Sequence, residues 1–521
     1  CGELWSEEEM ASFCSFGEQY VSGNLPSWFV EVWLSVECVG LFKTAQQEVR
    51  VAEADRPIRP IGMRDALVKC FHREVFRQNR SEVDKFLYPQ QLALEKGGGS
   101  KLVHTVRWHG EAAEREGQVL FKWDVSNGYS ETMRLACLRV LKGQASLRHL
   151  EWFVFQLFGA RYGLVSSGEL FGGAEEGVAQ GDPLSTSLFC VTVQPALRRL
   201  DEALAAVGGL ARCGADDGYA WGPPEVLFPA VEEFRREMAA VGLEFQLSKC
   251  GLYVPEGVEI PAEVEVPEGL RRCGREVEGE FQSGFLCWGV PVGTKKFVAV
   301  ELKEKVEEVK ERAERAVKVV GPHSKHSLWN LLQFSIAHQM DYWFQLCYPS
   351  DTREAAEEFD GVLWWMLEQV VGFRIQRQDG EGGAARAGEL VLSAEAASLD
   401  GATFQQAVAW LPSKAGGLGL RSSVPTRKAA FLGALQQATP ALRAASRQSV
   451  SLKESGGERV GLQPNQWGEM LELSGRVGRE VGAAYIALQS EARELAEWAG
   501  AEVPKCFEAE TANFGGVESG G

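Results

Sequence analysis

The segment 211–222, with the sequence ARCGADDGYAWG, places Asp216 directly beside Asp217 among mainly small, apolar and aromatic residues. Two like charges one residue apart repel each other, and burial raises the cost of keeping both ionised. A tight turn would explain the pair, because Asp-Gly favours a two-residue hairpin turn. A divalent-metal site would also explain it, because a cation cancels the repulsion. Alone, the segment favours the turn, so the rest of the chain must decide.

Size and composition narrow the class of protein. The 521 residues are too many for one ordinary core, so we expect about two to four structural units. With 45% hydrophobic and 24% charged residues, the chain is globular rather than disordered. No apolar run is long enough to span a membrane, and no secretory signal is visible. Because the chain starts with Cys1 rather than Met, we expect a fragment or a processed product that another domain can precede.

The cysteines and the charge distribution bear on cofactors and partners. The 12 cysteines form no C-x2-C pair and the seven histidines have no ligand spacing, so we expect no zinc site. Scattered thiols without a signal peptide indicate an intracellular setting, with nucleus and cytoplasm not distinguished. The net charge of −18 argues weakly against nucleic acid as a partner. Residues 56–80, however, carry seven Lys or Arg against Asp65 and Glu74, which can form one basic groove in an acidic protein.

Local patterns predict where the carboxylates lie. Residues 118–125 read as a short buried strand that ends at Asp124, and Asp216-Asp217 lies between two apolar segments, as in a hairpin. Asp182 is a candidate N-cap for a helix with Pro183 in its first position. Carboxylates at the ends of adjacent strands can converge on two Mg²⁺ ions about 3.5–4 Å apart, which is the arrangement that phosphoryl transfer needs.

Five segments, in this order, resemble the palm motifs of reverse transcriptases. Motifs A to E correspond to FKWDVSNGY, AQGDPLSTSLF, GADDGYAW, GLEFQLSKCGL and FLCWGVPVG. Upstream, RPIRPIGMRDALVKCFHREV resembles the fingers of the non-LTR retrotransposon enzymes, and residues 411–435 resemble the segment that follows their thumb. The resemblance spans roughly residues 50–435, and motif B is its most specific part.

The resemblance implies an α+β, right-hand fold with fingers, an antiparallel palm sheet, a helical thumb and a helix-rich C-terminal region. We expect an acidic helical extension over 1–55, fingers and palm over 56–300, an exposed acidic insertion over 255–280, a thumb over 301–370 and a C-terminal region over 371–521. The uninterrupted amphipathic pattern over 301–320 predicts a helix in the thumb.

The resemblance also assigns roles to individual residues. Asp124, Asp216 and Asp217 would be catalytic and, with the backbone carbonyl of Val125, would hold two Mg²⁺ ions, with Mn²⁺ as an alternative. Nucleotide binding would involve Val125, Tyr129, Gln180, Gly181 and Lys249, with Tyr129 as a steric gate against ribonucleotides. Nucleic-acid contacts would come from Arg56, Arg59 and Arg64. Each residue also has a structural explanation: Asp124 as a helix cap, Gln180 as a loop amide, Tyr129 as packing, and Lys249 and the arginines as solvated surface.

Two departures from the family pattern concern the site. Motif C normally has an aromatic residue where Gly214 stands, which affects the primer end, and motif A normally has Ala or Pro where Gly128 stands, which loosens the turn. The sequence therefore predicts an RNA-directed DNA polymerase that extends a DNA primer with dNTPs on an RNA template. The alternatives are an inactivated or domesticated descendant that binds nucleic acid without catalysis, an RNA-dependent RNA polymerase, and an acidic scaffold with a turn at Asp216-Asp217. Oligomeric state, the parent element and the template are not predicted.

Overall fold

A computed structural model describes residues 6–42, 58–113, 116–125, 127–159, 162–247, 249–372 and 418–450, with a few positions between 479 and 490. The chain divides into two compact units. The first unit comprises Cys1–Gly98, Gln118–Leu252 and Ile260–Arg271, and the second comprises Gly99–Gly117, Tyr253–Glu259 and Arg272–Gly521. Both contain helices and strands, so the fold is mixed, as expected. None of the helices in the described ranges combines the length and apolarity that a membrane span requires.

The central sheet of the first unit is built around the predicted hairpin. β6 (Leu210–Gly214) and β7 (Asp217–Gly222) pair antiparallel, and β7 pairs antiparallel with β3 (Val119–Trp123). The sheet order is β6-β7-β3-β8-β9, in which β8 is Gly251–Tyr253 and β9 is Arg271–Arg272. β3 is buried at every position except Lys122, which explains its nearly continuous apolar sequence.

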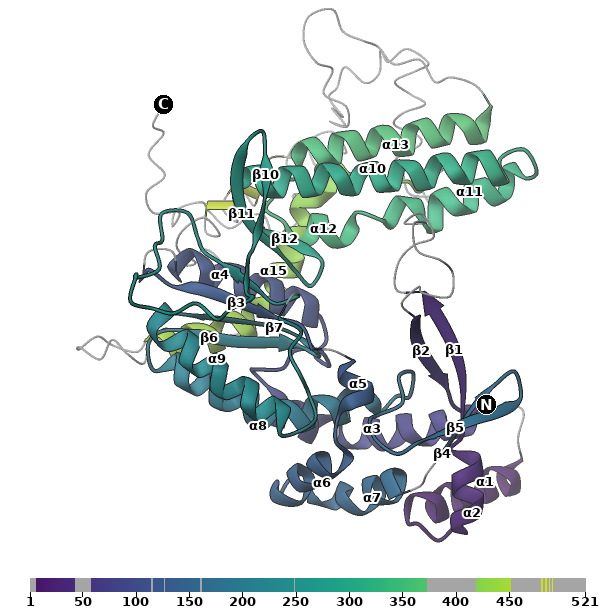
Figure 1. The fold of residues 1–521 in the computed structure, drawn as a ribbon. Coiled ribbons are helices and arrows are strands. Elements are labelled where there is room, and N and C mark those ends of the chain that lie inside the picture. Colours follow the sequence, from purple (N-terminus) through teal and green to yellow (C-terminus); the bar gives the residue numbers. More distant parts are fainter. Residues whose placement is uncertain are drawn as a thin grey trace, which may run out of the picture. The chain divides into compact units, whose positions relative to one another are not determined.

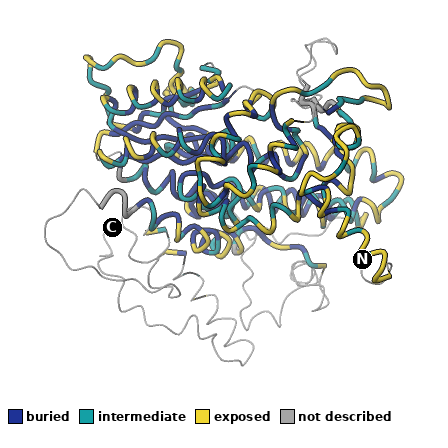
Figure 2. Tube along the Cα trace, turned by 90° about the horizontal axis from the view of Figure 1, so that it is seen from below, coloured by how far each residue is buried: buried dark blue, intermediate teal, exposed yellow. Residues whose placement is uncertain are grey.

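Two long helices of the first unit accompany this sheet. α8 (Ser185–Ala205) contacts β6, β7 and α9 (Pro224–Ala239) (Figure 1), and most of its residues are buried. Figure 2 shows the buried segments of the chain in dark blue. The sequence placed the start of α8 too early. The helix begins at Ser185, and its N-cap position is Leu184 rather than Asp182. The Asp182 carboxylate instead accepts a hydrogen bond from the Leu184 N–H in the turn that precedes the helix.

A second sheet in the first unit has the order β2-β1-β4-β5. Its strands are β1 (Val36–Phe42), β2 (Ile58–Met63), β4 (Tyr162–Ser166) and β5 (Glu169–Ala174). The helical extension expected over 1–55 also contains a strand, because β1 lies within it. α1 (Glu7–Val21) and α2 (Ser27–Trp33) are helical as expected, and α1 begins with a capping box between Ser6 and Glu9.

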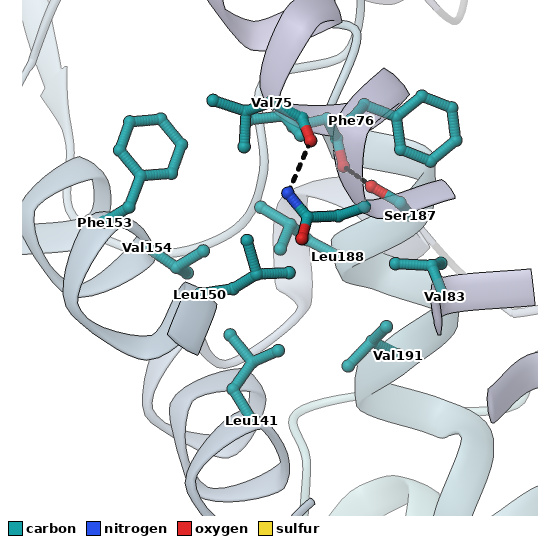
Figure 3. A pocket seen from close by; sticks show the side chains of 12 residues that line it. Val75, Phe76, Val83, Leu141, Leu150, Phe153, Val154, Ser187, Leu188 and Val191 are labelled. Carbon is teal, nitrogen blue, oxygen red and sulfur yellow. Dashed lines mark hydrogen bonds between the residues drawn. The ribbon is translucent and has the colours of Figure 1, made fainter. Parts of the chain in front are cut away.

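Three further helices pack around the start of α8 in the first unit. α3 (Ala66–Leu87) and α6 (Arg134–Gly143) contact α8, and α7 (Glu151–Gly159) contacts α6. Residues of all four helices line a small apolar cavity of about 20 Å³, with Val75, Leu141, Phe153 and Leu188 among its walls (Figure 3). The short α5 (Gly128–Glu131) follows β3. No titratable side chain lines this cavity, so it is packing space rather than a catalytic site.

The second unit combines a three-stranded sheet with helices. β10 (Gly274–Val277), β11 (Glu280–Cys287) and β12 (Val290–Gly293) form an antiparallel meander, which confirms the predicted turn in FLCWGVPVG. Its helices are α4 (Gly98–Ala113), α10 (Lys295–Val320), α11 (Lys325–Phe334), α12 (Asp341–Leu346), α13 (Arg353–Val371) and α15 (Ser423–Val450).

Two expectations for the second unit are resolved by these elements. Leu302, Val306, Val309 and Ala313 are buried on α10, so the predicted helix over 301–320 is confirmed. The region 255–280 is not only an exposed insertion, because β10 joins the sheet through β11. Of the C-terminal region expected over 371–521, the structure describes mainly α15, which is helical as expected, and most of the rest lies outside the described residues.

Candidate active site at the hairpin between β6 and β7

Strand register gathers the three predicted carboxylates at one end of the central sheet. Trp123 of β3 pairs with Gly218 of β7, so Asp124 follows directly beside Asp217. Gly214 of β6 pairs with Asp217, which leaves Ala215 and Asp216 as the two-residue turn. The predicted hairpin is therefore present, but its turn is Ala-Asp rather than Asp-Gly.

Gly218 lies within the strand for a steric reason. A Cβ atom at this position would come within 1.8 Å of the ring of Trp123, the residue directly opposite on β3. The glycine that follows the two aspartates therefore admits the indole of Trp123, which is 1% exposed. Trp123 in turn packs against Phe234 of α9 and Phe245, so the strand that leads to Asp124 is held by an aromatic cluster.

The turn itself is held from outside the hairpin by Gln91. Ala215 adopts φ +63°, a left-handed conformation that is unfavourable for a residue with a side chain. The Gln91 amide compensates for this: its Oε1 accepts from the Ala215 N–H at 2.8 Å, and its Nε2 donates to the Ala215 carbonyl at 3.2 Å. The sequence reading missed Gln91, because no local pattern connects it to a turn more than a hundred residues away.

A buried ion pair lies under the hairpin. Arg212 of β6 and Asp201 of α8 have fully buried side chains and are 2.8 Å apart. Asp201 also accepts from the Ala211 N–H at 2.9 Å and from Gln90 Nε2 at 2.8 Å. A buried pair with additional hydrogen bonds fixes geometry strongly, because losing one partner would leave an uncompensated charge. The arginine just before motif C thus anchors β6 to α8.

The carboxylates influence one another electrostatically. The pKa of Asp217 is raised to about 6, first by burial and then by the negative charges of Asp216 and Asp124, while Lys122 opposes the shift. The sequence reading did not single out Lys122, whose side chain provides the nearby positive charge. Such a raised pKa is typical of a functional site, although a structural cluster can have it too.

The proposed metal ligands are of the right chemical type, but their side chains are not already arranged around one point. Within the described ranges, no three His, Cys, Asp or Glu side chains lie close enough together to hold a metal ion. Carboxylates and a backbone carbonyl are nevertheless the donors that a hard divalent cation prefers. Burial is the main cause of the raised pKa of Asp217, and a cation would relieve the carboxylate repulsion that adds to it. Val125, the predicted carbonyl donor, is 4% exposed and forms an isolated bridge with Phe245.

Tyr129 is oriented by α8. Its ring stacks on Phe189 with centroids 5.1 Å apart, and its hydroxyl donates to Thr186 Oγ1 at 3.1 Å. Burial is the main cause that raises its pKa to about 12, so the hydroxyl is un-ionised at neutral pH, and the negative charge of Asp216 also contributes. Gly128 lies against the same ring, because a Cβ there would be 3.0 Å from Phe189. The motif A turn is therefore packed against motif B rather than loose.

Gln180 and Gly181 lie in a loop beside β2. The Gln180 carbonyl accepts from the Gly62 N–H at 2.6 Å. Gly181 has φ +114°, and a Cβ there would be 2.5 Å from the Gly62 carbonyl oxygen, so this close approach requires glycine. The Val178 N–H donates to the Tyr129 carbonyl at 2.7 Å, which ties this loop to motif A.

The basic residues that were expected to contact phosphates lie in different surroundings from one another. Arg64 is 5% exposed and forms an ion pair of 2.6 Å with Asp182, so in this structure it stabilises the fold and does not face phosphates. Arg59 lies in β2 opposite Leu41, and Arg56 lies outside the described residues. Lys249 is exposed just before β8.

No protein-family model matches the chain, and no curated protein matches it. Similar solved structures include apo telomerase from Candida tropicalis (TM-score 0.39, 9% identity, 81% of this chain and 66% of that one). Telomerase from Candida albicans with a fragment of telomeric RNA gives a TM-score of 0.38 at 11% identity over 85% of this chain and 71% of that one. The RNA-dependent RNA polymerase of a human picobirnavirus gives 0.36 at 14% identity over 64% of this chain and 56% of that one. Similarities at these TM-scores and identities do not define a function, which has to follow from the chemistry of the site.

Proposed function

We propose that the protein is an RNA-directed DNA polymerase of the non-LTR retroelement type, which adds dNTPs to the 3′-hydroxyl of a DNA primer on an RNA template. The observation that carries this proposal is the register of β3, β7 and β6, which brings Asp124 beside Asp217 and leaves Asp216 in the turn. The ordered sequence motifs on either side of these residues support the same assignment. The proposal includes the fingers, palm and thumb that the sequence motifs imply.

In the proposed reaction, the primer 3′-oxygen attacks the α-phosphorus of the dNTP, and the bond to the β-phosphate breaks to release pyrophosphate. Asp124, Asp216, Asp217 and the carbonyl of Val125 would hold two Mg²⁺ ions, or Mn²⁺ instead, which supply charge neutralisation and activate the hydroxyl.

The protein's other residues would orient the substrates. Gln180 and Gly181 would support the templating base and the incoming nucleotide, and the Tyr129 ring would lie below the sugar. Lys249, which is exposed just before β8, would lie beside the triphosphate and offset part of its charge.

The test is single-nucleotide extension of a DNA primer on an RNA template by the purified chain with Mg²⁺. Asp216→Asn removes one proposed ligand charge and should abolish extension, while the apo protein keeps its fold because a repelling charge is lost. Asp341→Asn, a change at an exposed aspartate of α12, is the matched control and should extend normally. Extension by Asp216→Asn at a rate near that of the wild type would refute the metal assignment.

A second function is favoured by one departure at the site. Gly214, the last residue of β6, stands where the family pattern has the aromatic residue of motif C, directly before the turn that carries Asp216. A site that holds the primer end less firmly is consistent with a descendant that binds nucleic acid without catalysis. Binding of a primer–template together with a complete lack of extension in Mg²⁺ or Mn²⁺ would establish this function in place of the first.

A further inference from the structure

A buried chain of polar side chains connects the N-terminal helix α1 to the loop Ala179–Leu184, which we call the motif B loop. The Tyr20 hydroxyl lies 2.8 Å from His72 Nε2. On the other side of the ring, His72 Nδ1 lies 2.8 and 3.0 Å from the carboxylate oxygens of Asp182. Tyr20 is 4% exposed, His72 0% and Asp182 7%, so water does not compete for these contacts.

The proton positions follow from the charge of Asp182. Burial would raise the pKa of Asp182, but hydrogen bonding to His72, the charges of His72 and Arg64, and the Leu184 N–H together hold it below its usual value. The ionised carboxylate can only accept, so His72 Nδ1 carries a proton and donates it. Both ring nitrogens are hydrogen-bonded in either form of the ring: an unprotonated Nε2 accepts from the Tyr20 hydroxyl, and a protonated Nε2 donates to its oxygen.

The Asp182 carboxylate determines how the motif B loop lies. It receives the Arg64 guanidinium at 2.6 Å and the Leu184 N–H at 2.9 Å in addition to His72. The Asp182 N–H and the Ser185 hydroxyl both donate to the Ala179 carbonyl, at 3.0 and 2.6 Å. Asp182 therefore holds the Leu184 end of the loop through its carboxylate and the Ala179 end through its N–H, so a shift of this residue would disturb the turn that carries Gln180 and Gly181.

The packing of α1 on α3 leaves little freedom for this chain of contacts. Phe13 and Tyr20 of α1 pack on Phe71, with ring centroids 5.0 and 6.1 Å apart. A Cβ at Gly17 would come within 2.4 Å of the Phe71 ring, so the two helices are in close contact there. The Phe153 ring packs edge-on against both Tyr20 and His72, at 5.8 and 5.9 Å.

We propose that Tyr20 and His72 are positioning residues for the motif B loop, so that α1 is part of the nucleotide-binding apparatus rather than a separate extension. The contact runs from the hydroxyl of α1 through one imidazole to the carboxylate next to Gly181. The nucleotide-binding role of the loop rests on the proposed function, whereas its positioning by α1 does not.

Hydrogen–deuterium exchange of the full chain tests the positioning without any activity. Tyr20→Phe removes one hydroxyl and should accelerate exchange of the Asp182 and Leu184 amides about tenfold or more. His72→Leu should do the same, whereas His72→Gln should restore protection, because one amide can donate to Asp182 and accept from Tyr20. The control is Ser6→Ala, which breaks the capping box of α1 but leaves Tyr20 intact, and it should leave the motif B loop unchanged.

A kinetic arm extends the test to nucleotide binding. In primer extension, Tyr20→Phe should raise the KM for dNTP at least threefold with kcat within twofold of the wild type, because no metal ligand is altered. Unchanged loop exchange in Tyr20→Phe, or equal acceleration in Ser6→Ala, would overturn the proposal even if the wild type extends primers. Faster loop exchange in Tyr20→Phe, together with a wild type that never extends primers, would instead uphold the positioning and reject the proposed function.

Discussion

Asp217 lies where the turn of the hairpin meets strand β7, and burial and two further carboxylates act on it together. At the scale of single residues, this carboxyl is what distinguishes the hairpin from an ordinary solvated turn. In an ordinary turn both aspartates would be solvated, and neighbouring groups would have little effect on the pKa of either carboxyl. Asp217 is instead half-buried and sits beside Lys122 of the next strand, and β6 and β7 hold it in place.

The raised pKa of Asp217 predicts a pH-dependent stability. Its folded pKa of about 6 lies above the unfolded value of about 3.9, so the folded state binds the proton more tightly. The favourable contribution is complete below about pH 4 and is lost as pH rises through about 6. Without divalent metal, Asp217→Asn should therefore be more stable than the wild type at pH 7.5 by about 1–2 kcal/mol, with little difference near pH 4.

Thermal unfolding of both proteins at the two pH values measures this difference. Excess Mg²⁺ should reduce the stability difference between the two proteins at pH 7.5, because a bound cation stabilises the ionised wild type. The same gap at both pH values would show that Asp217 does not titrate as its surroundings indicate.

Tyr129 leads to a second prediction at this scale. Its ring is fixed by Phe189 and its hydroxyl by Thr186, so ring and hydroxyl can be removed separately. If the ring excludes a 2′-hydroxyl, Tyr129→Val should keep dNTP incorporation but raise rNTP incorporation about tenfold or more, which corresponds to about 1.4 kcal/mol. Tyr129→Phe is the matched control and should keep the discrimination, because the ring remains.

The measurement is single-nucleotide extension with dNTP and rNTP on one primer–template. A ratio that stays unchanged in an active Tyr129→Val variant would show that the ring only packs against α8. Efficient use of rNTPs by the wild type would instead favour an RNA-dependent RNA polymerase.

At the scale of elements, the hairpin depends on contacts that come from elsewhere in the chain. Gln91 follows α3 and pairs with Cys213 in an isolated bridge, and its amide makes two hydrogen bonds to Ala215. Gln91→Leu would remove both of these hydrogen bonds from Ala215 in a left-handed turn. We expect the hairpin to lose about 1–3 kcal/mol of stability. Any metal-dependent activity should fall as well, because Asp216 and Asp217 would be held less firmly.

Amide exchange at Cys213 to Gly218 measures that loss locally, and it does so even if the rest of the molecule unfolds separately. Gln78→Leu, a change at an exposed glutamine of α3 bound to Glu74, is the control for a Gln-to-Leu change outside the turn. Equal exchange in the Gln91 and Gln78 variants would mean that the turn is stable without Gln91.

The elements also show what could be predicted from the sequence. The strand before Asp124, the hairpin, the amphipathic helix over 301–320 and the turn in FLCWGVPVG follow from periodicity and turn chemistry, which are local. The helix start at Ser185 was misplaced, because Asp182 is used by Arg64 and His72 as well as by the turn. Gln91, Tyr20 and His72 could not be found, because their partners lie far away in the sequence and only packing brings them together.

At the scale of the whole molecule, an acidic chain must present a basic path if it binds nucleic acid. The formal net charge is −18, while the segment 56–80 is basic. The structure reduces the number of free charges in this segment: Arg64 is buried with Asp182, Arg77 is hydrogen-bonded to Glu74, and Arg80 is paired with Asp84. The remaining candidates for phosphate contacts include Arg56, Arg59 and the exposed Arg73.

The last prediction concerns the salt dependence of primer–template binding. Each phosphate contact releases counterions, so log K falls linearly with log salt in proportion to the number of contacts. Replacing Arg56 and Arg59 with Gln should reduce this slope by about two if both side chains contact phosphates. Replacing Arg77 and Arg80 with Gln removes the same formal charge, but these side chains are already paired with Glu74 and Asp84, so the slope should stay close to that of the wild type. Fluorescence anisotropy from low to moderate salt gives both slopes. Equal changes in the two double variants would indicate a general effect of charge, and no change in either would place the path of the nucleic acid on another surface.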